Sequence, residues 1–291
     1  MDGIRTLKDS ADETAPFGHF APTGFCAFAL RITRRCSVGW FGKRTAFFLR
    51  GLAVRSLRGR PVDVVSLGAR MRLNPHHNVA EKRLLFTPQY FDPQERALLA
   101  TRLKGDFVFL DAGASVGGYA LYAAALGGPR ACILAIEPLP EVFERLAYNI
   151  QQSDFANVKA VSCALADVDG EITLFVNTTN QGETSIRIVS AEARVEQMRV
   201  RAKKLLTLVG EEGYSKIDAI KLDIEGAEDL ALDPFLSEAP RALWPRLIIM
   251  EFSLLRAGAH LEERLRALGY REILRTVENV AYELDDAKRD E

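Results

Sequence analysis

The stretch Phe107-Val108-Phe109-Leu110-Asp111-Ala112-Gly113-Ala114-Ser115-Val116-Gly117-Gly118 decides the fold of this chain. A short apolar run ends at an acid and a glycine-rich turn, and a helical pattern follows over Val116 to Leu126. An apolar strand placed directly before a helix is typical of a parallel sheet covered on both faces. The turn after such a strand lies at the carboxyl edge of the sheet, where open α/β folds bind their ligands.

The same alternation of strand and helix continues along the chain. We expect further strands at Ala131 to Ile136, Val158 to Ala164, Ile217 to Leu222 and Leu247 to Met250, separated by helices at Pro140 to Gln152, Ala227 to Leu236 and, after the last strand, His260 to Leu268. Alternating apolar residues over 171–176 and 195–205 predict extra antiparallel strands at an edge. Two hairpins are also expected, at Val62 to Leu73 and at Tyr270 to Leu284.

The charge of the chain is uneven. Its 291 residues carry a net charge of −1, which argues against a nucleic-acid binder of the usual basic type. Residues 1–60 hold 11 basic and 4 acidic residues, net +7, which leaves 27 and 35, net −8, for residues 61–291. Between Phe17 and Arg60 there are nine basic residues, several aromatic ones and no acid.

We expect residues 1–60 to form a basic helical extension, for which two interpretations stay open. The extension packs on the main domain with its basic face in water, or residues 17–60 lie on an anionic membrane surface or a partner. No apolar run is long enough for a membrane span, and the first residues lack the pattern of a signal peptide. Four scattered cysteines, with Cys132 and Cys163 expected to be buried, favour a reducing compartment, and we predict a cytoplasmic protein.

Asp111, Gly113 and Gly117 form the first candidate site. Their spacing differs from the G-x-G-x-x-G pattern that cradles a dinucleotide. A carboxylate at Asp111 would repel a diphosphate and attract a cation, so it favours S-adenosylmethionine, with its ammonium and sulfonium, over a nicotinamide cofactor. The alternative is that Asp111 caps the following turn and that the glycines serve close packing.

Two further strand ends supply candidate contacts for a nucleoside. Glu137 follows the next strand, where an acid can accept hydrogen bonds from both ribose hydroxyls. The strand that ends at Ala164 would place backbone groups beside the adenine, although any buried strand would look alike.

Asp223 and Glu225, in the stretch Lys221-Leu222-Asp223-Ile224-Glu225-Gly226-Ala227-Glu228, are the candidate catalytic residues. Two acids two positions apart at a strand end can face one pocket and accept the proton of a hydroxyl. They could also hold a divalent ion, but we assign no metal to the site. Alternatively, Lys221 pairs with one acid and the others stabilise the next helix.

Weaker candidates surround these positions. Glu251 and His260 are our second choices for a base, and His76 and His77 precede the core in a loop that could fold over the site. Polar residues of the expected insertion could bind acceptor hydroxyls, namely Asn180, Gln181, Thr184 and Ser185.

Together, the glycine-rich stretch, Glu137-Pro138, Asn149 and the K-x-D-x-E-G-A-E string resemble the FkbM family of S-adenosylmethionine-dependent methyltransferases. The resemblance covers about residues 80–255. It implies a class I, Rossmann-like α/β fold over residues 61–291, with a seven-stranded, mostly parallel sheet and an antiparallel last strand. This chain departs from the family pattern at Ser115, where the family usually has Asn.

The resemblance also implies an activity and roles for residues. Asp111, Gly113 and Gly117 would hold the methionine part of the cofactor and Glu137 its ribose, while Asp223 and Glu225 would lie where cofactor and acceptor meet. The implied reaction is methyl transfer to an oxygen of a small molecule or sugar. The alternatives we weigh are an NAD-type oxidoreductase and a catalytically silent module that binds a membrane or a partner.

Overall fold

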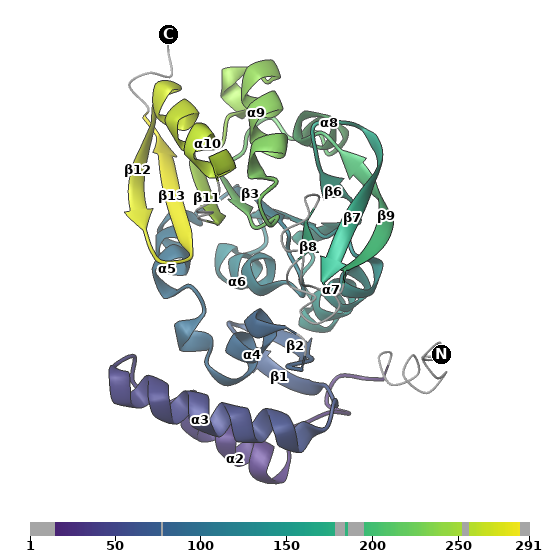
Figure 1. The fold of residues 1–291 in the computed structure, drawn as a ribbon, viewed down its shortest axis with the longest axis vertical. Helices are drawn as coiled ribbons and strands as arrows, with labels where there is room; N and C mark the ends of the chain where they lie inside the picture. Colours follow the sequence, from purple (N-terminus) through teal and green to yellow (C-terminus); the bar gives the residue numbers. More distant parts are fainter. Residues whose placement is uncertain (1–14, 77, 178–183, 186–194, 252–255, 286–291) are drawn as a thin grey trace.

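A computed structural model describes residues 15–76, 78–177, 184–185, 195–251 and 256–285. Its centre is a seven-stranded sheet in the order β12-β13-β11-β10-β3-β4-β5 (Figure 1). The five parallel strands are β3 (Val108–Ala112), β4 (Cys132–Ile136), β5 (Val158–Val161), β10 (Ala219–Leu222) and β11 (Leu247–Glu251). The terminal hairpin of β12 (Tyr270–Arg275) and β13 (Asn279–Leu284) joins β11 through antiparallel pairing. This sheet confirms the predicted α/β, Rossmann-like fold.

Helices cover both faces of this sheet, because successive strand residues point to opposite sides. Phe109 belongs to one apolar cluster, whereas its neighbours Val108 and Leu110 belong to the other. The Phe109 side is covered by α5 (Pro93–Arg102), α6 (Gly118–Gly127) and α7 (Pro140–Ser153), and the Leu110 side by α8 (Leu205–Glu211), α9 (Glu228–Glu238) and α10 (Arg256–Ala267). Every strand of the sheet centre is therefore buried on both faces, as its continuous apolar sequence predicts.

The extra strands form a sheet of their own, which corrects part of our expectation. This second sheet has the order β6-β9-β7-β8 and consists of β6 (Ala164–Leu165), β7 (Gly170–Asn177), β8 (Thr184–Ser185) and β9 (Val195–Lys203). The run Val158 to Ala164 is not one strand, because β5 ends at Val161 and Ala164 instead pairs with Ala202 of β9.

The N-terminal part forms a layer below the main sheet in Figure 1. It consists of α2 (Gly24–Thr33), α3 (Trp40–Leu57), the hairpin of β1 (Val62–Ser66) and β2 (Ala69–Leu73), α4 (Val79–Phe86) and the short 3₁₀ helix η1 (Pro88–Tyr90). The antiparallel pairing of β1 with β2 confirms the first predicted hairpin. Buried residues of both long helices, such as Ala29 and Ala53, belong to the same apolar cluster as Phe109.

The two cysteines that we expected to be buried differ in their exposure to solvent. Cys163 is buried, but Cys132 is exposed, so its predicted burial was wrong. Cys132 is the first residue of β4 and lies at the open end of the strand, ahead of the four buried residues that follow. Among the described residues, no helix has both the length and the apolar character that crossing a bilayer requires.

Candidate active site

The glycine-rich turn joins β3 to α6 and is held from within by Asp111. The Asp111 side chain is buried, and its Oδ2 accepts a hydrogen bond of 2.8 Å from the backbone N–H of Ala120 in the first turn of α6. Burial raises the pKa of Asp111 to about 7, although the nearby ammonium of Lys221 works in the opposite direction. Asp111 thus makes the capping contact that our alternative interpretation described.

Gly113 lets this turn lie against the segment that carries Asp223. Its φ is +78°, and a Cβ added there would collide with the backbone oxygen of Asp223. The N–H groups of Gly113 and Ala114 both donate to the carbonyl of Ile136, at 2.9 Å. The turn is therefore fixed between the ends of β4 and β10, its neighbours on either side of β3 in the sheet.

Ser115 and Gly117 also have left-handed backbone conformations, with φ of +50° and +98°. Asn adopts this region more readily than Ser does, because its short amide side chain can hydrogen-bond locally. This conformation is a physical reason for the family's usual Asn at a position where this chain has Ser115.

Glu137 connects the second strand end to the first. Its Oε2 accepts from the N–H of Ser115 and its Oε1 from the N–H of Leu139, both at 3.0 Å. Burial raises the pKa of Glu137 to about 7 against the effect of these two hydrogen bonds. Each carboxylate oxygen keeps a second lone pair with which to accept a ribose hydroxyl. Ala164, the remaining predicted contact, is buried at the start of β6, three residues after β5 ends.

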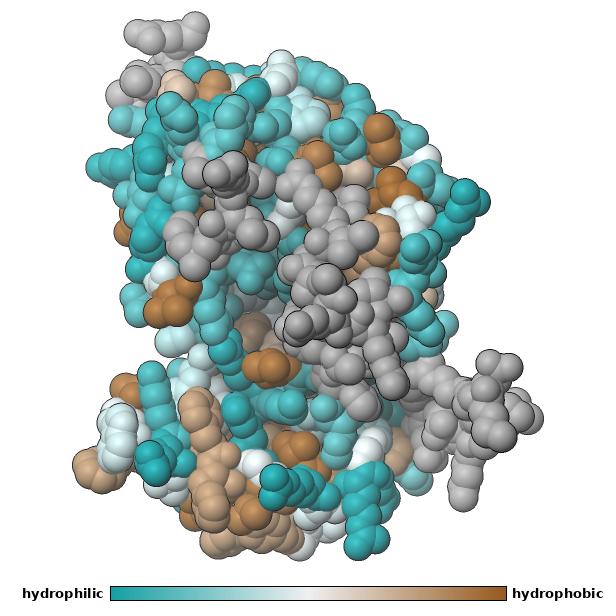
Figure 2. Space-filling view, in the orientation of Figure 1, coloured by the Kyte–Doolittle hydropathy of each residue, from teal (hydrophilic) through white to brown (hydrophobic). Residues whose placement is uncertain are grey.

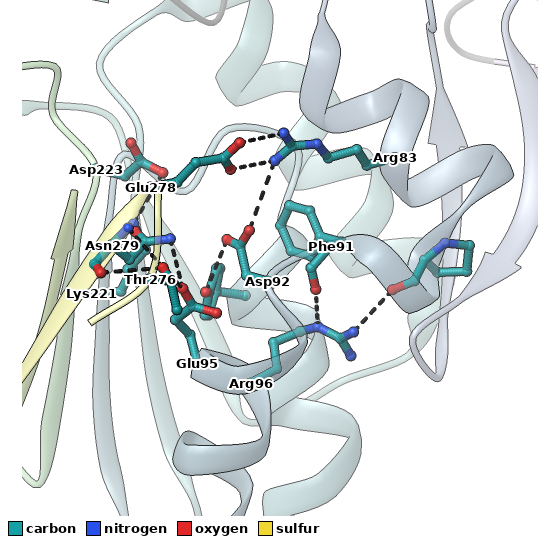
Figure 3. Close-up of polar contacts among 12 residues, drawn as sticks. Arg83, Phe91, Asp92, Glu95, Arg96, Lys221, Asp223, Thr276, Glu278 and Asn279 are labelled. Atoms are coloured by element: carbon teal, nitrogen blue, oxygen red, sulfur yellow. Dashed lines mark hydrogen bonds and ion pairs between the residues drawn. The ribbon is translucent and has the colours of Figure 1, made fainter. Parts of the chain in front are cut away.

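Lys221 places one positive charge beneath this edge of the sheet (Figure 3). Its side chain is only 1% exposed, and its Nζ lies 3.1 Å from Oδ2 of Asp223 and 5.5 Å from the ring centroid of Tyr119. Burial alone would lower the pKa of Lys221, but the carboxylates of Asp223, Asp92 and Asp111 outweigh it and raise the pKa. Lys221 is therefore an ammonium surrounded by acids.

The turn after β10 separates the roles of its acids. Glu228 uses Oε1 to accept from the N–H groups of Ile224 and Gly226, both at 3.3 Å, so it stabilises the turn before α9. Lys221 pairs with Asp223, and Glu228 stabilises the start of the next helix. For these two acids the structure thus shows the structural roles that we gave as the alternative to catalysis. Glu225 adopts a left-handed φ of +54°, which is uncommon for a residue with a side chain.

Asp223, Glu225 and Glu251 come together in three dimensions. One carboxylate oxygen from each lies within 4.8 Å of the others. The Asp223 side chain is 44% exposed, so solvent reaches the cluster. Burial, and after it repulsion from Asp223, raises the pKa of Glu251 to about 7. Such a cluster can take a proton from a bound hydroxyl, and its oxygen ligands are also of the kind that a hard divalent ion accepts.

The other histidine and loop candidates do not join this cluster. His260 has a side chain that is 72% exposed and lies 3.9 Å from Asp233 of α9. His76 accepts a hydrogen bond from the N–H of Gly59 at 2.9 Å, which ties its loop to the end of α3. Thr184 and Ser185 form β8, while His77, Asn180 and Gln181 lie outside the described residues.

Sequence reasoning missed a polar network that closes one side of the site (Figure 3). The hydroxyl of Tyr119 donates to Asp92 at 3.0 Å, and Glu95 accepts from Thr276 and Asn279 at 2.6 and 3.2 Å. Arg83 of α4 makes a two-pronged ion pair of 2.5 Å with Glu278 of the terminal hairpin. The one local signal is Asp92-Pro93, an acid before a proline that opens a helix.

Comparisons with known proteins identify the class of this chain. Residues 111–272 match the methyltransferase FkbM domain family. The methyltransferase sdnD of Sordaria araneosa is 30% identical over 147 residues, which cover 41% of this chain and 56% of that protein. The AMB antimetabolite synthetase AmbE of Pseudomonas aeruginosa is 29% identical over 191 residues, covering 54% of this chain and 9% of that protein. The chain thus spans about half of one curated relative and a small part of the other.

Two solved structures illustrate more distant likenesses. The methyltransferase domain of METTL16 is 16% identical, with a TM-score of 0.48 over 91% of this chain and 94% of that one. Fibrillarin of Aeropyrum pernix, solved with natively bound S-adenosyl-L-methionine, is 11% identical, with a TM-score of 0.40 over 65% and 74% of the two chains.

The chain carries a Rossmann-like domain of the methyltransferase class, since its sheet and its family match agree. It belongs to the FkbM methyltransferase family, because the match covers more than half of its length. The cofactor of this family is S-adenosylmethionine, and the family match does not favour the alternative of an NAD-type oxidoreductase. The residues fit that cofactor, because Asp111, Glu137 and Asp223 place three carboxylates around a glycine turn in which a Cβ at Gly113 would collide with the Asp223 backbone.

Proposed function

We propose that the protein transfers a methyl group to a hydroxyl oxygen of a small molecule or sugar. The observation that carries this proposal is the convergence of Asp223, Glu225 and Glu251 beside the glycine turn. A hydroxyl acceptor loses its proton when it is methylated, so the enzyme needs a base at the point of transfer. S-adenosylmethionine supplies a methyl group already activated by its positive sulfur.

The three carboxylates have different environments and therefore different roles. Asp223 pairs with Lys221 and is partly exposed, which suits a carboxylate that accepts a hydrogen bond from the acceptor hydroxyl. Glu251, with its pKa raised to about 7, can take up and release a proton near neutral pH. Glu225 lies on the turn that follows Asp223, close to both other carboxylates, and orients the hydroxyl. Holding the reacting groups in line can supply roughly 7–11 kcal/mol of the barrier reduction.

The experiment combines product identification with variants of the cluster. The protein is incubated with S-adenosylmethionine carrying a ¹³C-labelled methyl group and an extract of small molecules, and labelled products are identified by mass spectrometry and NMR. We expect a ¹³C-labelled methyl ether. With the acceptor so found, Glu251→Gln, which removes the proton acceptor, should lower kcat by about 10²-fold or more, since general-base catalysis contributes on that scale. Asp223→Asn and Glu225→Gln, which remove the groups that bind and orient the hydroxyl, should each lower kcat as well.

A matched control is available in Asp106→Asn. Asp106 has a side chain that is 79% exposed and pairs only loosely with Arg130, at 3.6 Å. This variant should retain the wild-type rate. A labelled product methylated on nitrogen or carbon would refute the choice of acceptor atom. A fully active Glu251→Gln variant would refute the assigned base, and a fully active Asp223→Asn, Glu225→Gln double variant would refute the roles of those two acids.

A further inference from the structure

Exposed apolar side chains gather on the two N-terminal helices. Of the 13 large hydrophobic residues that are exposed in the described part of the chain, eight lie between Phe25 and Leu52, all within or between α2 and α3. Phe41 is 79% exposed and Phe48 67% exposed. We call this set the N-terminal surface, and it consists of Phe25, Phe28, Val38, Trp40, Phe41, Phe47, Phe48 and Leu52. Contiguous apolar patches of this kind on a folded protein mark interaction sites.

The outward face of α3 mixes these apolar residues with arginines. Phe41, Arg44, Phe48 and Arg55 follow one another at intervals of three, four and seven residues, so they lie on the same side of the helix. Ala46 and Ala53 lie on the other side and are fully buried. Figure 2 shows apolar residues interspersed with hydrophilic ones over this lower part of the molecule.

The charge of the surface selects the kind of partner. Residues 17–60 contain nine Lys and Arg and no acid, whereas residues 61–291 carry a net charge of −8. A second copy of this surface would be repelled by the first, since both are basic. An anionic bilayer attracts the arginines and also accepts Phe and Trp side chains into its interfacial region. A nucleic acid could attract the arginines but would not bury a whole apolar face.

A cavity that is lined in part by α2 lies next to this surface. Its volume is about 570 Å³, and its lining includes Arg31, Arg34 and Arg35 together with Asp63. Arg34 is held there by donating to the carbonyls of Leu85 and Val65, at 2.9 and 2.8 Å. Its Nη2 is buried and has no hydrogen-bond partner among the described residues. Asp63 is neutralised by its own ion pair with Arg72.

We propose that the N-terminal surface docks on an anionic lipid bilayer and that the arginine cavity receives an anionic lipid headgroup. The two long helices lie in the plane of the interface, with Phe41 and Phe48 inserted among the headgroups and Arg44 and Arg55 beside the lipid phosphates. The main sheet stays on the opposite side of the N-terminal layer, in water (Figure 1).

The test is co-sedimentation of the full chain with vesicles of phosphatidylcholine, alone or mixed with phosphatidylserine. We expect binding to the mixed vesicles that weakens as salt is added, because the attraction is partly electrostatic. Arg44→Gln with Arg55→Gln should lower the partition coefficient by roughly tenfold or more. Phe41→Ser with Phe48→Ser should lower it by a similar factor, because two apolar side chains no longer leave water.

The control pair is Arg271→Gln with Val277→Ser, which changes a charge and an apolar residue of similar exposure on the terminal hairpin, at 76% and 92%. It should bind vesicles as the wild type does, and circular dichroism should show all variants folded. The proposal is overturned if the wild type does not sediment with the mixed vesicles, or if the two α3 variants sediment as well as it does. Binding to RNA without binding to vesicles would also overturn it.

Discussion

Gly113 is the residue at which the backbone geometry of the site can be tested most directly. Gly113→Ala combines a left-handed φ of +78° with a collision against the Asp223 backbone. Gly213 is a control, because its φ is also positive, at +70°, and a Cβ added there meets nothing within 4 Å. Gly213→Ala should lower the free energy of unfolding by roughly 1–2 kcal/mol through backbone strain alone.

Gly113→Ala should cost more than this control and should also weaken cofactor binding, because the turn must move away from Asp223. Urea unfolding and calorimetric titration with S-adenosylmethionine measure the two effects. Equal losses of stability in both variants, with unchanged cofactor affinity, would show that the close approach has no consequence.

Lys221 gives a second prediction at the scale of one residue. Lys221→Met removes the buried ammonium beside Asp111 and Asp223, so the already raised pKa of Asp111 should rise further. At pH 6 Asp111 is mostly protonated and tolerates the loss of the ammonium. At pH 8 Asp111 is ionised, and its buried carboxylate is left without the Lys221 ammonium. We expect a loss of unfolding free energy of about 3–5 kcal/mol at pH 8 and a smaller one at pH 6.

The control for Lys221 is Lys204→Met. Lys204 pairs at 3.5 Å with Glu238, whose side chain is 49% exposed, so the replacement of Lys204 should cost under about 1 kcal/mol at either pH. Urea unfolding at the two pH values measures both variants. A loss in Lys221→Met that does not depend on pH would contradict the compensating role of the ammonium.

The sequence located the acids of the site but not all of their roles. Asp111, Glu137, Asp223 and Glu251 each follow an apolar run, so their position at the carboxyl edge is a local property. The hydrogen bond from Ala120 to Asp111 depends on where α6 turns, which no pattern specifies. Glu95 and its partner Thr276 are 181 residues apart, so only the folded chain brings them together.

Among the elements, β1 carries the buried acid on which the N-terminal layer depends. Asp63 forms an ion pair of 2.8 Å with Arg72 of β2 and accepts from the N–H groups of Gly18 and Phe20. Burial acts to raise the pKa of Asp63, but Arg72 and the two N–H groups outweigh it, and the net pKa is lowered. Asp63 therefore stabilises the fold above its unfolded pKa of 3.8, and this contribution is lost as the pH falls through its lower folded pKa.

Asp63→Asn should lower the free energy of unfolding by about 3–5 kcal/mol at pH 7, because Arg72 is left buried without its anion. The difference from the wild type should shrink as the pH falls below 3.8 toward the folded pKa of Asp63. Urea unfolding across this range measures it, with exposed Asp106→Asn as the control. A difference that stays constant down to acidic pH would mean that charge is not the source of the effect.

The elements themselves were predicted well where the pattern is continuous and poorly where it breaks. All five parallel strands were expected because each is a mainly apolar run, although Lys159 and Lys221 interrupt two of them. The expected strand at Val158 to Ala164 instead divides, since Ala164 pairs with the distant β9 and not with β4. Competition between two sheets for one segment is a tertiary effect, and alternation along the sequence does not reveal it.

For the whole molecule, the buried acids predict how stability and cofactor binding depend on pH. Asp111 and Glu137 have pKa values of about 7 against ordinary values of 3.8 and 4.5. Between these limits the folded state binds more protons than the unfolded state, so the free energy of unfolding should fall as pH rises from about 4.5 to 7. A positively charged cofactor favours the ionised acids, so it should bind more tightly at pH 8 than at pH 6.

Calorimetric titrations with S-adenosylmethionine at pH 7, in buffers of different ionisation enthalpy, measure the protons exchanged on binding. Glu137→Gln removes one of the titrating groups, so fewer protons should be released than by the wild type. S-adenosylhomocysteine lacks the sulfonium charge and should show a weaker dependence of affinity on pH. Equal proton release by the wild type and the variant would contradict the assignment of this acid.

The position of β10 beside β3 has a consequence for how the enzyme is made. Asp218 accepts a hydrogen bond from the N–H of Val108, a contact between residues 110 positions apart. The middle of the sheet therefore closes only after the 110 residues that follow Val108 have left the ribosome, and Glu251 emerges later still. Contacts so distant in sequence slow folding and leave apolar strand edges open during synthesis. During synthesis, one edge of β3 therefore stays unpaired for a long time, and we expect chaperones to bind the nascent chain in this interval.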